Sequence, residues 1–264
     1  MPDELETRVR EIADGLDGRL GLVVRSLGGA DLRLELNAAE PFPAASVIKL
    51  AILWTFFEEV DRGRLDPAEP WTLEPAAKVG GTGVLQLLGD GLRLSLLDLA
   101  TLMIVVSDNT ATNAVIDRLG LERVQVATGR LGLTGTALRR RMLDFAARDR
   151  GLDNWTTPED TARLLDRFAT GAGLSPRSAE RARQILLGQQ FNNKLAARLP
   201  PDAALAHKTG ELPGLEHDAG WLEVGGATVV IATLTRDLRH NADGTAALAE
   251  IGRLIAERLA RTGG

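Results

Sequence analysis

The chain has 264 residues, of which 44% are hydrophobic and 25% charged, which is ordinary for a soluble globular protein with one large domain or two small ones. Its formal net charge is −5, from 31 basic and 36 acidic residues, and this balance argues against nucleic-acid or anionic-membrane partners. Cysteine is absent, which excludes disulfides and thiolate metal sites, and the three histidines show no metal-ligand spacing.

The first predicted element is an amphipathic helix over residues 3–14, where Leu5, Val9 and Ile12 recur with a helical period. This start is acidic, whereas an export signal has a basic start followed by an apolar run. No apolar run in the sequence is long enough to span a bilayer. We therefore expect a cytoplasmic location at face value, or a periplasmic or secreted one if a signal peptide was trimmed.

Strands are predicted near both ends of the chain. Residues 19–27 and 31–37 form a predicted hairpin around Gly28 and Gly29, and Pro41 and Pro43 then break the chain. The long middle is mostly helical, over residues 46–59, 95–105, 110–118, 121–131, 158–169 and 177–188. Strands return at 204–209, 217–224 and 227–235, followed by a helix over 244–261.

This order predicts an α/β (α+β) fold with one antiparallel five-stranded sheet built from both chain ends and flanked by the terminal helices. Residues 1–43 and 203–264 would form this sheet lobe, and residues 44–202 an inserted helical lobe, with the active site in the cleft between them. Residues 80–83 are glycine-rich but lack the context of a phosphate-binding loop, so we expect an ordinary loop there.

Three short motifs carry the candidate chemistry: Ser46-Val47-Ile48-Lys49, Ser107-Asp108-Asn109 and Lys208-Thr209-Gly210. The basic residues are otherwise nearly all arginine, 27 against 4 lysines. Arginine does not deprotonate in proteins, whereas the pKa of a lysine falls when it is buried. Two of the four lysines stand in these motifs, which indicates chemistry that requires lysine.

The first motif has the arrangement of an activated nucleophile. Ser46 opens a predicted helix, where free N–H groups favour a developing anion, and Lys49 follows one turn later on the same face. To act as a base, Lys49 needs its pKa lowered from about 10.4 to about 7, through burial and a second cation such as Lys208. The alternative is that Ser46 only caps the helix and Lys49 is a surface residue.

The second motif follows an apolar run. Ser107 could relay a proton to a leaving group and Asn109 could hold a substrate amide. Alternatively, Asp108 or Asn109 caps the next helix, although a cap accounts for one polar residue and leaves Ser107 unexplained.

The third motif ends a predicted strand. Lys208 and Thr209 offer a cation and a hydroxyl to a substrate carboxylate, and Gly210 leaves the strand edge open to a ligand backbone. The alternative is a plain strand end followed by a turn.

Together the motifs resemble the Ser-x-x-Lys, Ser-Asp-Asn and Lys-Thr-Gly set of class A β-lactamases and penicillin-binding proteins. Their order and spacing are similar across roughly residues 20–260, and further similar stretches are Gly81–Leu85, Leu96–Ala100, Met103–Asn113 and His207–Gly210. The resemblance implies a serine hydrolase that forms an acyl-enzyme with β-lactam or related acyl substrates. It also implies no cofactor and no metal, and we expect a monomer whose partner is a small-molecule substrate.

The resemblance also implies a role for each site residue. The catalytic residues would be Ser46, Lys49, Ser107, Lys208 and Asp144, and the substrate-binding residues Asn109, Thr209, Gly210 and Glu211. The backbone N–H groups of Ser46 and Glu211 would form the oxyanion hole. The alternatives are a D-alanyl-D-alanine peptidase or esterase on the same scaffold, and a penicilloyl-binding sensor without turnover. Glutaminases also carry a Ser-x-x-Lys motif, but the other two motifs favour a resemblance to β-lactamases.

The sequence departs from the family pattern in two places. Class A β-lactamases carry a glutamate in a loop after the second motif, but no glutamate occurs between Glu122 and Glu159. Asp144 is the best candidate to replace it and Asp149 the next, so we expect weak deacylation. Alternatively, Asp144 pairs with one of the arginines at 139–141 and holds the loop.

The second departure concerns the arginine that helps many family members to bind the antibiotic carboxylate. No arginine lies between Lys208 and Arg236, and His217 and Asp218 stand in the expected strand.

Overall fold

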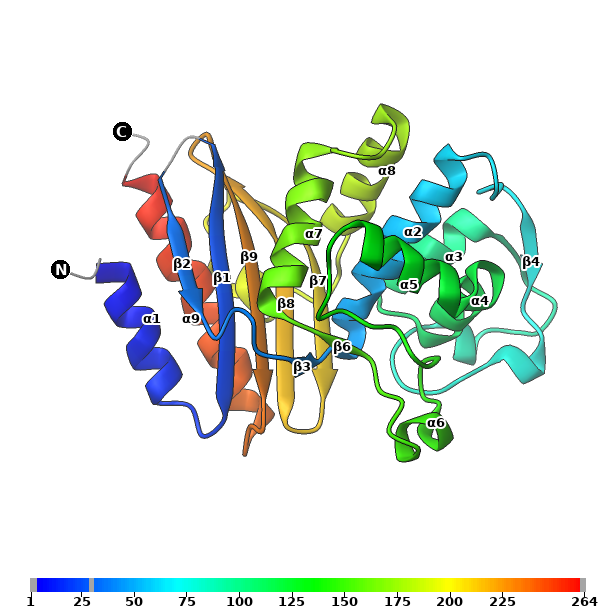
Figure 1. Ribbon diagram of the computed structural model, residues 1–264, viewed down its shortest axis with the longest axis horizontal. Coiled ribbons are helices and arrows are strands. Elements are labelled where there is room, and N and C mark those ends of the chain that lie inside the picture. Colours follow the sequence, from blue (N-terminus) through cyan, green and yellow to red (C-terminus); the bar gives the residue numbers. More distant parts are fainter. Residues whose placement is uncertain (1–3, 29–30, 262–264) are drawn as a thin grey trace.

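A computed structural model describes residues 4–28 and 31–261 and shows the predicted antiparallel sheet of five strands. Its strand order is β2-β1-β9-β8-β7, so segments from the two ends of the chain lie side by side, with β1 paired to β9 (Figure 1). The predicted turn residue Gly29 lies outside the described residues. The strands are β1 (Arg19–Gly28), β2 (Arg33–Leu36), β7 (Ala204–Leu212), β8 (Leu215–Val224) and β9 (Ala227–Arg236).

Both faces of this sheet are buried. Leu22 and Val24 of β1 face the core cluster beneath the terminal helices, whereas Val23 belongs to the larger cluster on the other face. This alternation follows from the two-residue period of a strand. The terminal helices are α1 (Glu4–Asp14) and α9 (Asn241–Ala260), which contact each other.

The opposite face of the sheet is covered by α7 (Pro158–Thr170), which packs against β1, β8 and β9. Thr157 caps this helix, and a proline begins it. The predicted helical lobe of residues 44–202 includes this helix, which packs on the sheet (Figure 1). The division into two lobes stays a prediction.

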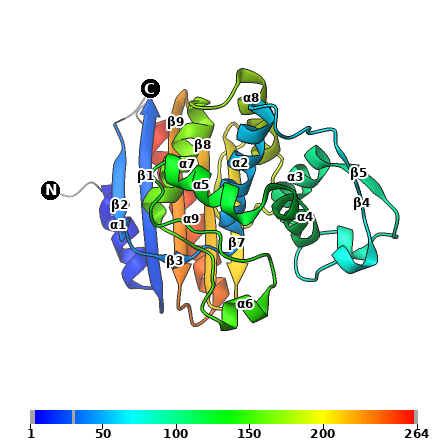
Figure 2. The same ribbon diagram turned by 45° about the vertical axis from the view of Figure 1, so that its right-hand side comes forward.

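The other long helices gather beyond the β7 edge (Figure 2). At their centre is α2, in which ten of 13 residues are buried, Trp54 and Phe56 among them. A helix that is apolar on all sides belongs in a core, and α2 contacts each of its neighbours. These helices are α2 (Lys49–Asp61), α3 (Leu96–Val105), α4 (Asn109–Leu119), α5 (Leu121–Arg130) and α8 (Pro176–Leu187).

The sequence analysis missed the short elements. They are the strand pairs β3 (Phe42–Pro43) with β6 (Trp155–Thr156) and β4 (Pro70–Thr72) with β5 (Arg93–Ser95), the helix α6 (Phe145–Asp149), and four 3-10 helices, η1 (Ala45–Ile48), η2 (Pro75–Ala77), η3 (Leu85–Leu87) and η4 (Leu195–Arg198). Elements of two to five residues are too short to show a period. None of the helices in the described ranges is long and apolar enough to cross a membrane.

Candidate active site

A cleft of about 720 Å³ lies where the predicted motifs meet. The structure brings together residues from all three motifs, although they are far apart in the sequence. Those that border the cleft are Ser46, Ser107, Asn109, Thr209 and Gly210, and Glu211, which follows the third motif, borders it as well. Lys49 and Lys208 are fully buried next to these residues.

Ser46 lies in the first turn of the helical segment, as the sequence predicted, but this turn is a 3-10 helix. It belongs to η1, and α2 begins only at Lys49. Neither helix has a side-chain cap, so the alternative of Ser46 as a simple cap is wrong. Ala45 has a φ of 43°, a left-handed conformation that is strained for a residue with a side chain. The strained turn leaves Ser46 half-exposed at the cleft.

Lys49 is buried and surrounded by oxygen atoms. Its Nζ lies 2.8 Å from Ser107 O, 3.0 Å from Ser107 Oγ and 3.0 Å from Asn109 Oδ1. Burial lowers its pKa to about 7, against an opposing effect of the Asp108 charge. A neutral Lys49 can donate to Ser107 O and Asn109 Oδ1 while it accepts from the Ser107 hydroxyl. Lys49 is fully buried, so the alternative of a surface lysine is wrong.

This environment predicts the pH dependence of acylation. The protonated amine has no free lone pair, so the acylation rate should rise about tenfold per pH unit below pH 7 and level off above it. Stopped-flow acylation by a β-lactam between pH 5 and 9 measures this profile, and circular dichroism at each pH checks that the fold persists. A rate that stays constant from pH 5 to 8 would contradict a base with this pKa.

Asp108 organises the second motif. It caps α4, as the sequence analysis allowed, with Oδ1 accepting from Ala111 N at 2.9 Å. Its Oδ2 also accepts from Val84 N at 2.7 Å and Leu85 N at 2.8 Å, which ties a distant loop to the motif. Ser107, with a φ of 52°, is thereby held in another strained conformation beside Lys49.

Asn109 uses its side-chain amide to hold Lys49. Oδ1 accepts from Lys49 Nζ, while Nδ2 donates to Gly80 O at 3.1 Å. Both amide atoms are therefore engaged within the protein. The arrangement makes Asn109 a positioning residue for the lysine, and its predicted contact with a substrate amide stays a prediction.

The glycine-rich residues 80–83 form a loop without helix or strand, and this loop packs directly on the second motif. Thr82 Oγ1 donates to Ser107 O at 2.8 Å. Gly83 has a φ of 111°, and a Cβ there would lie 2.4 Å from Asp108 atoms, so only glycine allows this contact. The glycines therefore serve close packing around the motif.

Lys208 is fully buried beside the cleft, and its Nζ donates to Thr209 O at 2.8 Å. Burial lowers its pKa well below the usual value, and the charge of Lys49 lowers it further. The sequence predicted that burial and a second cation such as Lys208 would lower the pKa of Lys49. Burial lowers it, and the charge of Lys49 in turn lowers the pKa of Lys208. Two adjacent cations in one buried space oppose each other's protonation.

Gly210 lets the third motif approach the nucleophile turn. A Cβ at this position would lie 3.2 Å from His217 Cβ and 3.3 Å from Ala45 Cβ. These distances are shorter than most Cβ contacts, so a side chain at this position would need its neighbours to shift by a few tenths of an ångström. The glycine thus allows β7 and η1 to pack closely beside Ser46.

Lys194 was missed by the sequence analysis. It precedes η4, its side chain is 2% exposed, and it borders the cleft. Nζ donates to Gly210 O at 3.0 Å and forms an ion pair with Glu216. Three of the four lysines are buried around this cleft. The scarcity of lysine was the one signal that pointed to Lys194, but it pointed equally to Lys78, which lies outside the cleft.

The residues in place of the expected arginine do not border the cleft. His217 is buried, its Nε2 donates to Pro43 O at 2.8 Å, and its Nδ1 accepts from Thr235 N at 3.1 Å. Burial lowers its pKa to about 4, so it is neutral at physiological pH. Asp218 is buried against His207 at 2.8 Å. The cations that border the cleft are Lys194, Arg140 and Arg148.

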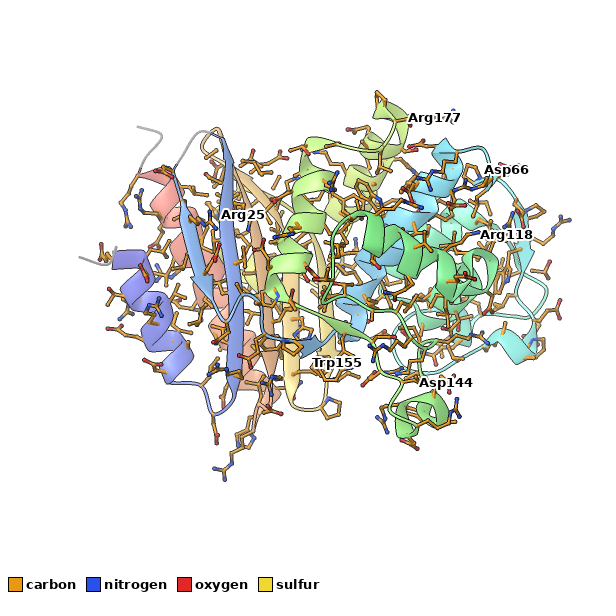
Figure 3. All side chains as sticks on the ribbon, viewed as in Figure 1. Arg25, Asp66, Arg118, Asp144, Trp155 and Arg177 are labelled. Atoms are coloured by element: carbon orange, nitrogen blue, oxygen red, sulfur yellow. The ribbon has the colours of Figure 1, made fainter. Side chains whose placement is uncertain are left out.

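Asp144 lies at the start of α6 and serves as its N-cap (Figure 3). Its Oδ1 accepts from Ala147 N at 2.9 Å. Asp149, the second candidate base, is exposed beside Arg148 at the end of the same helix. Neither aspartate is among the residues that border the cleft. The structure therefore does not bring them together with Ser46.

Arg140 and Arg141 pair with carboxylates other than that of Asp144. Arg140 pairs with Asp153 at 2.7 Å and Arg141 with Asp117 at 2.9 Å. The carboxylate of Asp144 therefore caps α6, and the suggested ion pair with one of these arginines is not formed among the described contacts. Asp153 does border the cleft, but the guanidinium of Arg140 holds it there.

Comparisons with known proteins define the class. A family model described as the Beta-lactamase enzyme family matches residues 4–259, so the chain belongs to this family and the predicted resemblance is confirmed. The extended-spectrum beta-lactamase PER-1 of Pseudomonas aeruginosa is 26% identical over 218 residues, which cover 78% of this chain and 68% of that protein.

Solved structures agree with the family assignment. A beta-lactamase from Sphaerobacter thermophilus superposes with a TM-score of 0.90 at 29% identity and covers 98% of each chain. A variant of PBP-A in an acyl-enzyme complex with penicillin G superposes with a TM-score of 0.89 at 30% identity, over 99% of this chain and 100% of that one. The predicted β-lactamase-like fold is thereby confirmed.

Proposed function

We propose that this chain is a serine hydrolase that forms an acyl-enzyme at Ser46 with β-lactam or related acyl substrates and releases the product slowly. One observation carries the proposal: Lys49 is buried with a pKa near 7 and is hydrogen-bonded to Ser107, which borders the same cleft as Ser46. A hydroxyl nucleophile needs such a neighbouring base.

In the acylation step, Lys49 takes the proton of Ser46, directly or through Ser107. The Ser46 oxygen then bonds to the carbonyl carbon, and the backbone N–H groups of Ser46 and Glu211 stabilise the oxyanion. The carbon–nitrogen bond breaks, and the proton held by Lys49 passes through Ser107 to the departing nitrogen. The proton taken from Ser46 thus ends on the departing nitrogen, and the step uses no cofactor.

The substrate would lie along the end of β7. Thr209, Gly210 and Glu211 border the cleft there. Lys208 is fully buried beside this strand end, and Lys194 borders the cleft with its ammonium paired to Glu216.

Slow deacylation follows from the carboxylates of the cleft. Among the described residues, the acidic side chains that border it are Asp153 and Glu211. Asp153 is held in an ion pair with Arg140, and Glu211 belongs to β7. A water that attacks the acyl carbon needs a free base aimed at it. In the described loop of residues 139–154, the carboxylate that borders the cleft is that of Asp153, and it is already paired.

Asp144 can be tested separately as a base and as a cap. Asparagine caps helices as well as aspartate does, so Asp144→Asn removes the carboxylate and keeps the cap, whereas Asp144→Ala removes both. Because the carboxylate is used by α6, we expect the asparagine variant to keep the acyl-enzyme lifetime within about twofold. We expect the alanine variant to lose about 1 kcal/mol of stability. Stopped-flow nitrocefin kinetics with thermal melts measure both effects.

A much longer acyl-enzyme lifetime in Asp144→Asn at an unchanged melting temperature would restore Asp144 as the deacylation base. The effect would then be at least about a hundredfold, the low end for general-base catalysis.

Mass spectrometry of the intact protein mixed with benzylpenicillin tests the proposed function. We expect an adduct with the full mass of the antibiotic, which persists after the free drug is removed. Rapid hydrolysis without an adduct would show that deacylation is fast. The absence of both adduct and hydrolysis, with several β-lactams, would overturn the proposal.

The second candidate is a D-alanyl-D-alanine peptidase or esterase, or a penicilloyl-binding sensor, on the same site. The missing deacylation base favours it, because all three would be acylated by penicillin and hydrolyse it poorly. Release of D-alanine from a peptide ending in D-alanyl-D-alanine, or hydrolysis of a thioester analogue, would identify the peptidase or esterase. A stable adduct without either activity would identify the sensor.

A further inference from the structure

Two phenylalanines stand out because they are exposed. The chain has six phenylalanines, and four of them are at most 3% exposed. The other two, Phe145 and Phe191, are 53% and 39% exposed, and both border the cleft that contains Ser46. Large apolar groups that gather at a groove mark a binding surface.

Phe191 is held in place by its backbone. The buried Gln189 accepts from Phe191 N at 3.0 Å through Oε1, and its Nε2 donates to Ile104 O at 3.0 Å. Gln190 N also donates to Val105 O at 2.9 Å. The segment is thus fixed to the end of α3, two residues before Ser107. Its ring is presented to the cleft by an ordered loop.

Phe145 is held by a different segment, the short helix α6. It is the first residue of α6, directly after the cap Asp144. The guanidinium of Arg148 lies over its ring, 5.0 Å from the centroid, and this contact fixes the ring and covers one of its faces. The cap therefore has a consequence for the site, because it places an exposed aromatic ring at the cleft.

Leu212 adds a third apolar group. It lies at the end of β7, is 38% exposed and also borders the cleft, while its carbonyl accepts from Asn241 Nδ2 at 2.9 Å. Three separate segments thus present apolar side chains to one space. Binding is favoured when a ligand covers apolar surface that was exposed to water, and a preorganised surface loses little entropy on binding.

We infer that Phe145, Phe191 and Leu212 form a specificity pocket for an aromatic or bulky apolar side chain of the acyl substrate. The inference rests on the proposed acyl transfer to Ser46 and deepens it, by naming the class of acyl group. A substrate with this side chain is acylated faster than one with the same reactive ring and no side chain.

Two compounds with one nucleus test this pocket. Benzylpenicillin carries a phenylacetyl side chain, and 6-aminopenicillanic acid has the same bicyclic β-lactam without it. The second-order acylation rate constant of each, followed by intact mass and stopped flow, gives a ratio. We expect the wild-type ratio to exceed about ten, and Phe145→Ala and Phe191→Ala each to lower it about two- to tenfold. Phe191→Leu keeps an apolar contact and should therefore retain part of the wild-type ratio that Phe191→Ala loses.

Val126→Ala provides the matched control. Val126 is 50% exposed on α5 and does not border the cleft, so its truncation should leave the ratio unchanged. Both phenylalanines are exposed, so their alanine variants should keep the wild-type melting temperature to within a few degrees.

The outcomes separate the two proposals. If Ser46 is acylated but the ratio is near one, or survives in both alanine variants, the pocket is overturned and the acyl transfer stands. If neither compound acylates Ser46, the proposed function fails, and the pocket fails with it.

Discussion

Ser46→Ala is expected to lower acylation by β-lactams at least about a thousandfold and to remove the covalent adduct. The reason is that Ser46 alone combines a position at the cleft with a buried lysine three residues later in the chain. The side chain is small and half-exposed, so stability should change by less than about 0.5 kcal/mol. Tryptic mapping after reaction with benzylpenicillin or a fluorophosphonate measures the adduct.

Ser26→Ala is the matched control for this experiment. Its buried Oγ has no hydrogen-bond partner among the described residues, and it lies on β1 in the sheet. Acylation should match the wild type in that variant. An adduct that persists in Ser46→Ala would remove Ser46 as the nucleophile.

Lys49→Arg should lower the acylation rate at least about a hundredfold, the low end for loss of a general base. Arginine keeps the positive charge but does not deprotonate. The substitution also places a planar guanidinium where three oxygen atoms surround a compact amine. Rapid-mixing kinetics with nitrocefin measure the rate, and circular dichroism checks the fold.

Lys78→Arg makes the same substitution outside the cleft. Lys78 binds Leu88 O and Asp90, contacts that arginine can also make. Its acylation rate should be that of the wild type. If Lys49→Arg were acylated almost as fast as the wild type and were properly folded, Lys49 could not be the base.

The long elements could be predicted from periodicity because their apolar patterns are strong. The predicted helix over 110–118 is α4, Asn109–Leu119, and the predicted strand over 227–235 is β9, Ala227–Arg236. The turn at Ser46 could not be predicted, since it depends on pairing with distant residues. Ala44 N donates to Asn154 O at 2.8 Å, next to the β3–β6 pair, and this contact fixes where α2 can begin.

The candidate site was predicted in part. The motifs named Ser46, Ser107 and Thr209, and the structure places them at one cleft. The depth of burial of Lys49 and Lys208 depends on how three segments pack, which no motif encodes. Phe145 and Phe191 carry no pattern at all, because an apolar residue in a loop or in a one-turn helix looks the same in sequence whether it is buried or exposed.

The strand order of the sheet sets the sequence in which the site can assemble during folding. The contacts of Lys49 with Ser107 and Asn109 span 58 and 60 residues. The contact of Pro43, beside the nucleophile turn, with His217 on β8 spans 174 residues. Contacts of long sequence separation form late, since a larger loop must close before they stabilise the chain. By this order the chain holds Lys49 before the strand with Lys208 and Glu211 pairs, and the proposed reaction at Ser46 becomes possible only at the last step of folding.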